Sequence, residues 1–452
     1  GLLGGALLLT TFDFAWMARR AQLDVLLALF ETLALVAFWR LSEGMGSRRR
    51  NLLAMHAALG AALLVKGPVG FLVPVLVMAT TLAARRRLRT LPSFLPLPAL
   101  LLSLGPALAW LLAAAALAPP EWLDEAVGRG VLQRFFTGSS HVRPFYYYLY
   151  HLPGDFLPWT LLWPLIYFAG RRSVFTRRPE DAVAARAWIF LLAWVGASVV
   201  FFSVSAGKRG VYLMPTFPAL ALLCADALLR TLEGRDRLPR ALSWGTAFLF
   251  GLLAIVAAAA SLAPFFPQPD VHMARLSIFG LLAGATVLLS ILAWRRVPAS
   301  APLSRRLWIP VATVFGIELA TFLVALPALD PGKSPRPIAV AAARWTGEDG
   351  RIGLYGQRPR VAGLRYYGDR PVVWEETLEG VERFIAAGGR VLVVRQEELE
   401  EVQERIPVEV LARFRSGRRG LLLVGPRGPQ DGSRVEDPPP AAAQDSARMA
   451  DP

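Results

Sequence analysis

The stretch FFSVSAGKRGVYLMPTFPALALL, from Phe201 to Leu223, decides how the fold is interpreted, because two apolar segments meet there at a short cationic loop. The loop carries Lys208 and Arg209, and Tyr212 follows Lys208 at the spacing of one helical turn. Apolar helices joined by short loops are typical of a chain that crosses a membrane repeatedly. Two cations at such a surface indicate a site that holds an anion.

The composition supports a membrane protein. Hydrophobic residues make up 54% of the 452 residues and the mean hydropathy is positive, whereas soluble domains stay near half apolar. We expect about 11 membrane helices, because runs of about 20 apolar residues span a hydrocarbon core. The runs lie near residues 1–18, 22–39, 51–66, 68–84, 93–118, 146–169, 185–206, 211–229, 241–263, 274–294 and 307–328. The predicted fold class is mainly α, a polytopic membrane helical bundle.

Arginine clusters predict the orientation of these helices. By the positive-inside rule, loops rich in arginine face the cytoplasm and the loops between them face outward. The clusters follow every second helix and include Arg48–Arg50, Arg85–Arg87, Arg171 with Arg172, Arg235 with Arg237, and Arg295 with Arg296. These loop arginines explain most of the net charge of +15, so the charge gives no reason to expect a nucleic-acid partner.

The ends of the chain and its single cysteine set further limits. The chain begins at Gly1 inside an apolar run and shows no signal peptide, so we expect it to be truncated at its N-terminus. Cys224 lies in an apolar segment and excludes a disulfide within the chain.

Residues 330–425 change character and predict a small extracytoplasmic α/β domain, which follows a membrane domain of residues 1–329. RIGLYG, PVVW, RVLVV and GLLLVG predict strands, whereas LEGVERFIAAGG and QEELEEVQERI predict amphipathic helices. The segment contains no glycine-rich phosphate loop and no nucleophile elbow. Residues 426–452 are rich in Pro, Ala, Gly, Asp and Ser and are predicted to be disordered.

Five residues on the predicted outward side are candidates for a phosphate clamp: Lys66, Arg134, Lys208, Arg209 and Tyr212. An ammonium supplies a compact charge, and a guanidinium binds two phosphate oxygens at once. If a helix starts near Arg209, Lys208 and Tyr212 share one face. Each cation alone is explained by a side chain that reaches lipid headgroups. Together they lie where positive charge is normally avoided, which favours a site.

Acidic and histidine side chains are weaker candidates. Asp24 opens a helix, where it either caps the N-terminus or positions or deprotonates an acceptor. Glu31 follows on nearly the same face and Glu318 lies in the last predicted membrane helix, and each is either functional or paired with a neighbouring helix. His56 is predicted to be a hydrogen-bonded packing residue. The outward segments also hold His141, His151 and Asp155.

No cofactor is evident in the sequence. A divalent metal is left open, but no spacing of histidine, cysteine or carboxylate residues supports a metal site.

Four stretches carry a family resemblance: ARRAQLDVLLALF, LLVKGPVGFLVPV, RFFTGSSHVRPFYYYL followed by PWT, and FFSVSAGKRGVYLMPTFPALALL. In this order and spacing they resemble the polytopic GT-C glycosyltransferases that use polyprenyl-phosphate sugars. Within that class the chain is most similar to bacterial relatives of the lipid A aminoarabinose transferase and of protein O-mannosyltransferases. The resemblance spans roughly residues 1–230.

The resemblance implies an inverting transfer at the outer face of the bacterial inner membrane, from a polyprenyl phosphate to lipid A, a glycan or a protein. Lys66, Arg134, Lys208 and Tyr212 fall on the lipid-phosphate positions, where cations stabilise the leaving group. Asp24 falls on a second acid. The family's main catalytic carboxylate lies in the first outer loop, which we expect upstream of Gly1, so this chain is expected to lack it.

Two other classes stay open from the sequence. A transporter or lipid flippase needs charges along a midplane pathway and usually an internal repeat, whereas here the polar residues gather at the outer surface. A structural or assembly membrane protein would explain the α/β domain but not the outward cations. An assay with a lipid-linked sugar donor separates the transferase from both.

Overall fold

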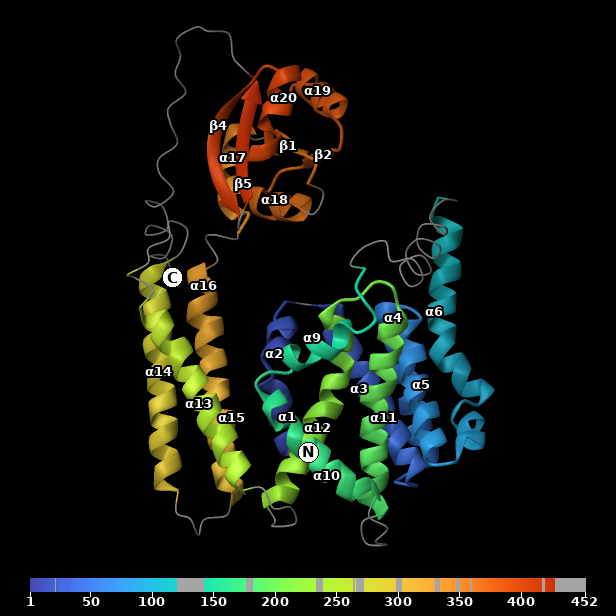
Figure 1. The fold of residues 1–452 in the computed structure, drawn as a ribbon. Helices are drawn as coiled ribbons and strands as arrows, with labels where there is room; N and C mark the ends of the chain where they lie inside the picture. The colour runs from blue at the N-terminus through green and yellow to red at the C-terminus, as the bar shows by residue number, and fades with distance from the viewer. Residues whose placement is uncertain are drawn as a thin grey trace, which may run out of the picture. The chain divides into compact units, whose positions relative to one another are not determined.

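The computed structural model describes most of the chain. The described residues are 1–20, 22–119, 142–175, 182–232, 239–262, 265, 272–297, 303–329, 334–346, 350–357, 360–416 and 419–426. They belong to two compact units, Gly1–Ile255 with Gly284–Glu318, and Val256–Ala283 with Leu319–Pro452. Figure 1 shows the elements of each unit. The domain division at residue 329 stays a prediction.

The first unit is built from helices. Its N-terminal part contains α1 (Leu2–Leu9), α2 (Phe12–Ala18), α3 (Leu23–Ser42), α4 (Arg48–Lys66), α5 (Val69–Ala84), η1 (Leu88–Phe94) and α6 (Leu97–Leu117). It continues with α9 (Tyr147–Asp155), η3 (Trp159–Leu162), α10 (Trp163–Phe175), α11 (Ala182–Val204), η5 (Gly210–Thr216) and α12 (Phe217–Leu232). Three further helices, α13 (Pro239–Ser261), α14 (Met273–Arg296) and α15 (Leu303–Ala320), contribute residues to both units.

Helix α3 shows why these elements suit a membrane. Leu27, Leu35 and Phe38 are fully buried in the unit, while Leu26 and Leu33 are 46% and 49% exposed. A helix that is apolar all round is either deeply buried or surrounded by lipid. The exposed leucines therefore form a lipid-facing surface.

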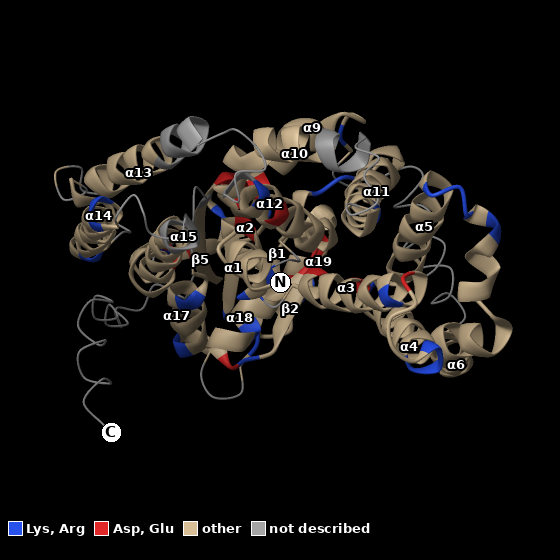
Figure 2. Ribbon diagram, turned by 90° about the horizontal axis from the view of Figure 1, so that it is seen from below, with Lys and Arg blue, Asp and Glu red and all other residues tan. Residues whose placement is uncertain are grey.

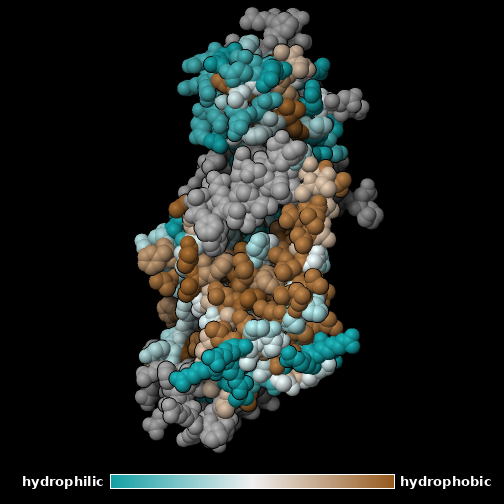
Figure 3. Space-filling view, turned by 90° about the vertical axis from the view of Figure 1, so that its right-hand side faces the viewer, coloured by the Kyte–Doolittle hydropathy of each residue, from teal (hydrophilic) through white to brown (hydrophobic). Residues whose placement is uncertain are grey.

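Six segments within the described residues are long and apolar enough to cross a membrane. They are Leu23–Ser42, Leu97–Leu117, Ala182–Val204, Gly210–Arg230, Met273–Arg296 and Trp308–Leu329. Figure 3 shows hydrophobic surface over the helices and hydrophilic surface over the α/β domain. The protein is thus a multi-pass membrane protein, and the predicted fold class is confirmed.

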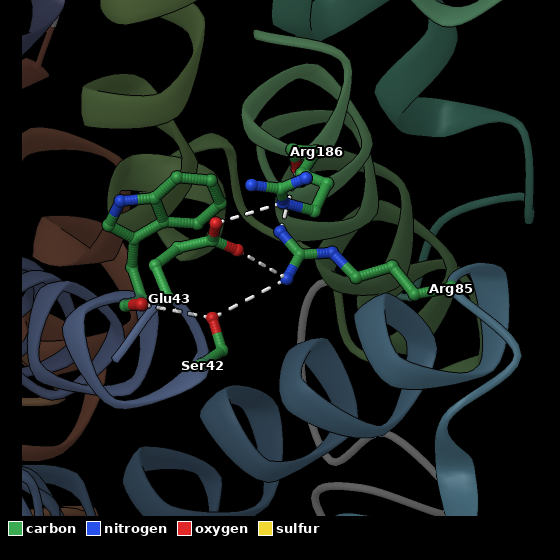
Figure 4. Close-up of polar contacts among 5 residues, drawn as sticks. Ser42, Glu43, Arg85 and Arg186 are labelled. Atoms are coloured by element: carbon green, nitrogen blue, oxygen red, sulfur yellow. Dashed lines mark hydrogen bonds and ion pairs between the residues drawn. The ribbon is translucent and has the colours of Figure 1, made fainter. Parts of the chain in front are cut away.

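A charged cluster ties three helices together at the arginine-rich end. Glu43, directly after α3, accepts hydrogen bonds from Arg85 Nη1 and Arg186 Nε, each at 2.9 Å (Figure 4). Arg85 follows α5 and stands over the ring of Trp39, 5.1 Å from its centre. Arg186 lies in α11. Figure 2 shows further basic residues after α5 and at the start of α4. This cluster fixes the ends of α3, α5 and α11 relative to one another.

Several of the predicted membrane segments are divided in the structure, and two of them show how. The first, residues 1–18, breaks into α1 and α2, because the hydroxyl groups of Thr10 and Thr11 donate to carbonyl oxygens of α1 at 2.7 and 2.9 Å. The segment predicted over residues 146–169 consists of α9, η3 and the start of α10. Neither break could be predicted from hydropathy, because two threonines or a short turn hardly change the mean hydropathy of an apolar segment.

The second unit contains a five-stranded sheet in the order β2-β1-β3-β5-β4. Its strands are β1 (Ile352–Tyr355), β2 (Val372–Glu375), β3 (Val391–Arg395), β4 (Val408–Ser416) and β5 (Arg419–Pro426). Strand β1 pairs in parallel with β2 and β3, whereas β5 pairs antiparallel with β3 and β4. The unit also contains η7 (Thr321–Ala325), α16 (Leu326–Leu329), α17 (Arg336–Thr346), α18 (Val361–Gly368), α19 (Leu378–Ala386), η9 (Gln396–Glu398) and α20 (Leu399–Arg405).

The sheet is buried on both faces. Along β3, Val391 and Val393 belong to one hydrophobic cluster, while Leu392 and Val394 belong to a second. Because successive side chains of a strand point to opposite faces, the two clusters cover the two sides of the sheet. A continuous apolar strand such as VLVV is typical of this arrangement.

Most of the α/β elements predicted from sequence are present. The four predicted strands correspond to β1, β2, β3 and β5, and the two predicted helices correspond to α19 and α20. Helix α19 begins after Thr377, whose hydroxyl accepts from the amide of Gly380, and ends shortly before Gly388 with φ +87°. The prediction missed β4, α17 and α18.

Candidate functional site

The ends of α3 and α4 bring together Asp24 and Lys66. Asp24 lies in the first turn of α3 and Lys66 is the last residue of α4, so an antiparallel pair of helices places them side by side. The ammonium of Lys66 donates to a carboxylate oxygen of Asp24 and forms an ion pair. The side chain of Lys66 is 23% exposed, whereas that of Asp24 is 9% exposed. The ammonium of Lys66 is therefore the more accessible partner, and the carboxylate of Asp24 is the more buried one.

Tyr212 completes this group from a third element. Lys66 Nζ lies 4.4 Å from the centre of the Tyr212 ring, and η5 supplies that ring. An aromatic face attracts an ammonium through its quadrupole. Phe202 packs on the same ring, with centroids 5.7 Å apart, and holds it in place. We call Asp24, Lys66 and Tyr212 the Lys66 cluster.

Lys208 is directed elsewhere. It is buried, and its ammonium donates to the carbonyl oxygens of Arg143 at 3.1 Å and Ser205 at 2.5 Å. Burial lowers the pKa of Lys208. A β-bridge between Val142 and Gly207 joins the same two segments. Lys208 therefore fastens the segment at Val142 to the cationic loop.

The expectation that Lys208 and Tyr212 share one helical face is wrong. Residues Gly210–Thr216 form a 3₁₀ helix, and the α-helix begins only at Phe217. Lys208 precedes both, so the four-residue spacing of an α-helix does not apply to it.

The two arginines of the predicted clamp have different outcomes. Arg209 is exposed, and its carbonyl oxygen accepts from the hydroxyl of Tyr148 at 3.1 Å. Its guanidinium thus stands at the surface of the loop. Arg134 and His141 lie outside the described residues.

A second polar group lies against the same loop. His151 Nδ1 and Asp155 Oδ2, one turn apart in α9, are 2.7 Å apart. A Cβ placed on Gly210 would lie 2.8 Å from Asp155 Oδ2 and 2.8 Å from His151 Cε1. The pair therefore packs directly on Gly210. Burial raises the pKa of Asp155, and the hydrogen bond from His151 opposes that rise.

Asp13 joins this second group and was missed from the sequence. It lies in α2, and burial together with the charge of Asp155 raises its pKa to about 6. The signal that could have found it is a carboxylate inside an otherwise apolar run of residues 1–18.

The remaining candidates fall inside the bundle. Glu31 is completely buried, and neither of its carboxylate oxygens has a hydrogen-bond partner among the residues that the structure describes. Glu318 is also buried, and one of its oxygens has no partner in the described part of the chain. His56 bonds to Ser103 Oγ at 3.2 Å and to the carbonyl of Phe94 at 3.0 Å, so its prediction as a packing residue is confirmed. Within the described ranges no three His, Cys, Asp or Glu side chains are grouped as a metal site.

The fold can be compared with the family resemblance seen in the sequence. A polytopic helical bundle with polar side chains gathered where α3, α4 and η5 meet, followed by an α/β domain, is the arrangement that the resemblance to GT-C glycosyltransferases implies. Two crystal structures of ArnT from Cupriavidus metallidurans share the fold. One, bound to undecaprenyl phosphate, has a TM-score of 0.67 at 22% identity, and the other, in the apo state, has 0.69 at 20%. Each match covers 93% of this chain and 78% of the crystallised chain.

Sequence comparisons point to particular relatives. Residues 1–115 match the family described as dolichyl-phosphate-mannose-protein mannosyltransferase. The chain is 31% identical over 278 residues to undecaprenyl phosphate-alpha-4-amino-4-deoxy-L-arabinose arabinosyl transferase 2 of Sodalis glossinidius, covering 59% of this chain and 48% of that protein. It is 33% identical over 232 residues to the transferase of Pseudomonas aeruginosa strain PAO1, covering 50% of this chain and 40% of that protein.

The family resemblance seen in the sequence is confirmed by these matches. The chain spans about half the length of the curated relatives it matches. Asp24 and Lys66 both fall within the residues that match the mannosyltransferase family model.

Proposed function

We propose that this protein is an integral-membrane glycosyltransferase that moves a sugar from a polyprenyl-phosphate donor to a lipid, glycan or protein acceptor. The names of the curated relatives favour an undecaprenyl-phosphate 4-amino-4-deoxy-arabinose donor. The observation that carries the proposal is the Lys66 cluster, in which an ammonium is held at a surface by a carboxylate and an aromatic ring.

The chemistry asks for a cation at the leaving group. In an inverting transfer, an acceptor oxygen attacks the anomeric carbon as the bond from that carbon to the phosphate oxygen breaks. The electron pair of that bond stays on the polyprenyl phosphate, and the acceptor's proton goes to a base. A fixed ammonium stabilises the charge that develops on the phosphate. In this proposal Lys66 supplies that charge, Asp24 orients Lys66, and Tyr212 covers it.

The roles of the other clamp residues follow from where they lie. In this proposal Arg209 adds a guanidinium at the surface of the loop. Lys208 acts on the donor mainly by holding that loop in position, which its hydrogen bonds to Arg143 and Ser205 support. Arg134 stays in the proposal through the family resemblance alone.

A binding assay tests the Lys66 cluster directly. We expect Lys66→Gln to weaken undecaprenyl phosphate binding by about 10- to 100-fold, as for a charge-assisted hydrogen bond, and to slow transfer from the lipid-linked sugar. Lys66→Arg should recover part of both, and Arg296→Gln, at an exposed helix end, should change neither. Unaltered undecaprenyl phosphate binding by Lys66→Gln would reject the cluster as the phosphate site.

We also propose that the protein lies in the bacterial inner membrane with its C-terminal α/β domain outside the cytoplasm. The arginine distribution supports this orientation. Alkaline phosphatase fused after residue 426 should be active, and the same enzyme fused after Arg296 should be inactive. The opposite pattern would invert the topology.

One observation favours the alternative of a transporter or lipid flippase. Glu31 and Glu318 are buried in membrane helices with unpaired carboxylate oxygens, and such groups often mark ion pathways. Glu31→Gln and Glu318→Gln separate the functions, because a transferase keeps its donor binding when these carboxylates lose their charge. Loss of proton-driven lipid movement with donor binding unchanged would favour the transporter.

A further inference from the structure

The lipid-facing surface of α3 and α4 carries a groove that the proposed reaction does not use. Its volume is about 400 Å³. Phe30, Leu33 and Val36 form one wall from α3, and Ala54 and Ala57 form the other from α4. Leu33 and Val36 are 49% and 44% exposed, so this wall faces the lipid. The small alanine side chains leave the hollow between the helices.

The groove ends at a polar group on the opposite side of the membrane from the Lys66 cluster. Arg40 and Asn51 line that end. Asp24 and Arg40 lie 16 residues apart in one helix, so about 24 Å separates the two ends at 1.5 Å per residue. The Asn51 amide donates to the carbonyl of Met45 at 2.6 Å and is already engaged.

Two guanidinium groups converge at this end. A Cβ on Gly46 would lie 3.5 Å from Arg40 Nη2 and 3.6 Å from Arg50 Nη2. The turn that brings them together uses Gly44 and Gly46 at φ +69° and +72°, which is a conformation that glycine adopts readily. Like charges repel at this spacing unless an anion lies between them.

Neither guanidinium is neutralised within the part of the chain that the structure describes. Arg40 Nε is buried without a hydrogen-bond partner, and no described carboxylate forms an ion pair with Arg40 or Arg50. Glu43 is the acid nearest to Arg40 in sequence, and Arg85 and Arg186 already share it. An apolar groove that ends at two unpaired arginines matches a molecule with acyl chains and an anionic headgroup.

The geometry points to a binding site for an anionic phospholipid between α3 and α4, with one acyl chain in the groove and the headgroup phosphate at Arg40 and Arg50. Basic pockets between membrane helices on the cytoplasmic side bind such headgroups, and the arginine-rich loops predict that this end is cytoplasmic. The bound lipid would neutralise the repulsion and stabilise the α3–α4 pair, whose other end carries the Lys66 cluster.

Native mass spectrometry of the full chain in a neutral detergent tests the headgroup contacts. We expect phosphatidylglycerol to bind more tightly than phosphatidylethanolamine, with a preference that falls as salt rises. Arg40→Gln and Arg50→Gln should each weaken phosphatidylglycerol binding about fivefold, and together on the order of 30-fold. Arg49→Gln is the matched control, because this exposed neighbour lies on the same first turn. Equal binding of the two lipids, or equal effects of Arg49→Gln and Arg50→Gln, would overturn the proposal.

A second variant tests the groove. Ala57→Trp fills it from an exposed position, so it should displace the lipid without disturbing the core, and the melting temperature checks the fold. Unchanged phosphatidylglycerol binding by Ala57→Trp would overturn the placement of the acyl chain. Undecaprenyl phosphate is the competing occupant. If it binds the groove and is lost in Ala57→Trp but not in the double arginine variant, the groove belongs to the donor's tail and the phospholipid site is wrong.

Discussion

At the scale of single residues, Tyr212 has two parts that can contribute differently to donor binding, its ring face and its hydroxyl group. Its face lies against the ammonium of Lys66, and in the proposed reaction its hydroxyl group donates to the phosphate of the donor. The spacing to Lys208 suggested the residue from sequence, but its contact partner is Lys66, which lies far away along the chain.

Two substitutions at Tyr212 distinguish these contacts. Tyr212→Phe keeps the aromatic face, so donor binding should fall only by what the hydroxyl contributes. Tyr212→Leu also removes the cation–π contact and should weaken undecaprenyl phosphate binding by a further 2- to 30-fold, on the order of 0.5–2 kcal/mol. Equal binding by the two variants would mean that the ring face contributes nothing to the position of Lys66.

Asp13 makes a prediction about pH. Its pKa of about 6 in the folded protein lies above the ordinary value of 3.8. The folded state therefore holds this proton more tightly than the unfolded state, and stability falls as pH rises from about 4 to about 6. Asp13→Asn should flatten this part of the profile and stabilise the protein at pH 7 by about 1–2 kcal/mol, a figure reduced for partial exposure. Thermal unfolding in detergent between pH 4.5 and 8 measures it, and a parallel profile for the variant would contradict the assignment.

At the scale of the elements, the cluster around Glu43 joins three helices that the sequence could only order along the chain. The arginine clusters predicted that the ends of α3 and α5 and the start of α11 lie on one side of the membrane. They could not predict that one carboxylate takes two of the arginines, because that depends on how the helices pack.

Glu43→Gln tests how strongly this cluster holds the helix ends. Arg85 is 7% exposed on its side chain, so removing its counter-charge should destabilise the protein by about 3–5 kcal/mol. Arg186→Gln is the matched variant, which removes only the ion pair between Arg186 and Glu43. Its side chain is 39% exposed, and the loss should be below about 1 kcal/mol. Chemical unfolding of both variants should give this order, and the reverse order would show that Arg186 holds the cluster.

The limits of the sequence prediction are clearest at two elements. Strand β4 was missed because its register shifts between Val410 and Ala412, which interrupts the alternation of apolar and polar residues. Lys208 was assigned to a helical face because hydropathy does not distinguish a 3₁₀ start from an α-helical one. Continuous apolar strands and long membrane helices were predicted correctly, because their patterns do not depend on distant partners. The contact of Lys66 with Asp24 does depend on such a partner, and topology could only place both on one side.

At the scale of the whole molecule, the chain combines a membrane bundle with an α/β unit that has its own cores. Residues such as Val393 and Leu423 are fully buried between strands and helices of that unit. A substitution in one of these cores should therefore lower the stability of the α/β unit without affecting the helical bundle.

Val393→Ala tests this independence. The substitution leaves a cavity and should lower the unfolding free energy of the α/β unit by about 1–3 kcal/mol. Undecaprenyl phosphate binding at the Lys66 cluster should stay at its original strength. Hydrogen exchange separates the two effects, with faster exchange expected in β1, β3 and β5 alone. Faster exchange in α3 and α4 as well would mean that the two units unfold together.

Gly210 has a consequence for how this family of sequences can diversify. The pair of His151 and Asp155 occupies the space that any side chain at residue 210 would need. A relative with a larger residue there must therefore turn the ends of these two side chains aside or carry a smaller side chain at one of the two positions. The cationic loop and helix α9 are thus constrained to change together, although 55 residues or more separate them along the chain.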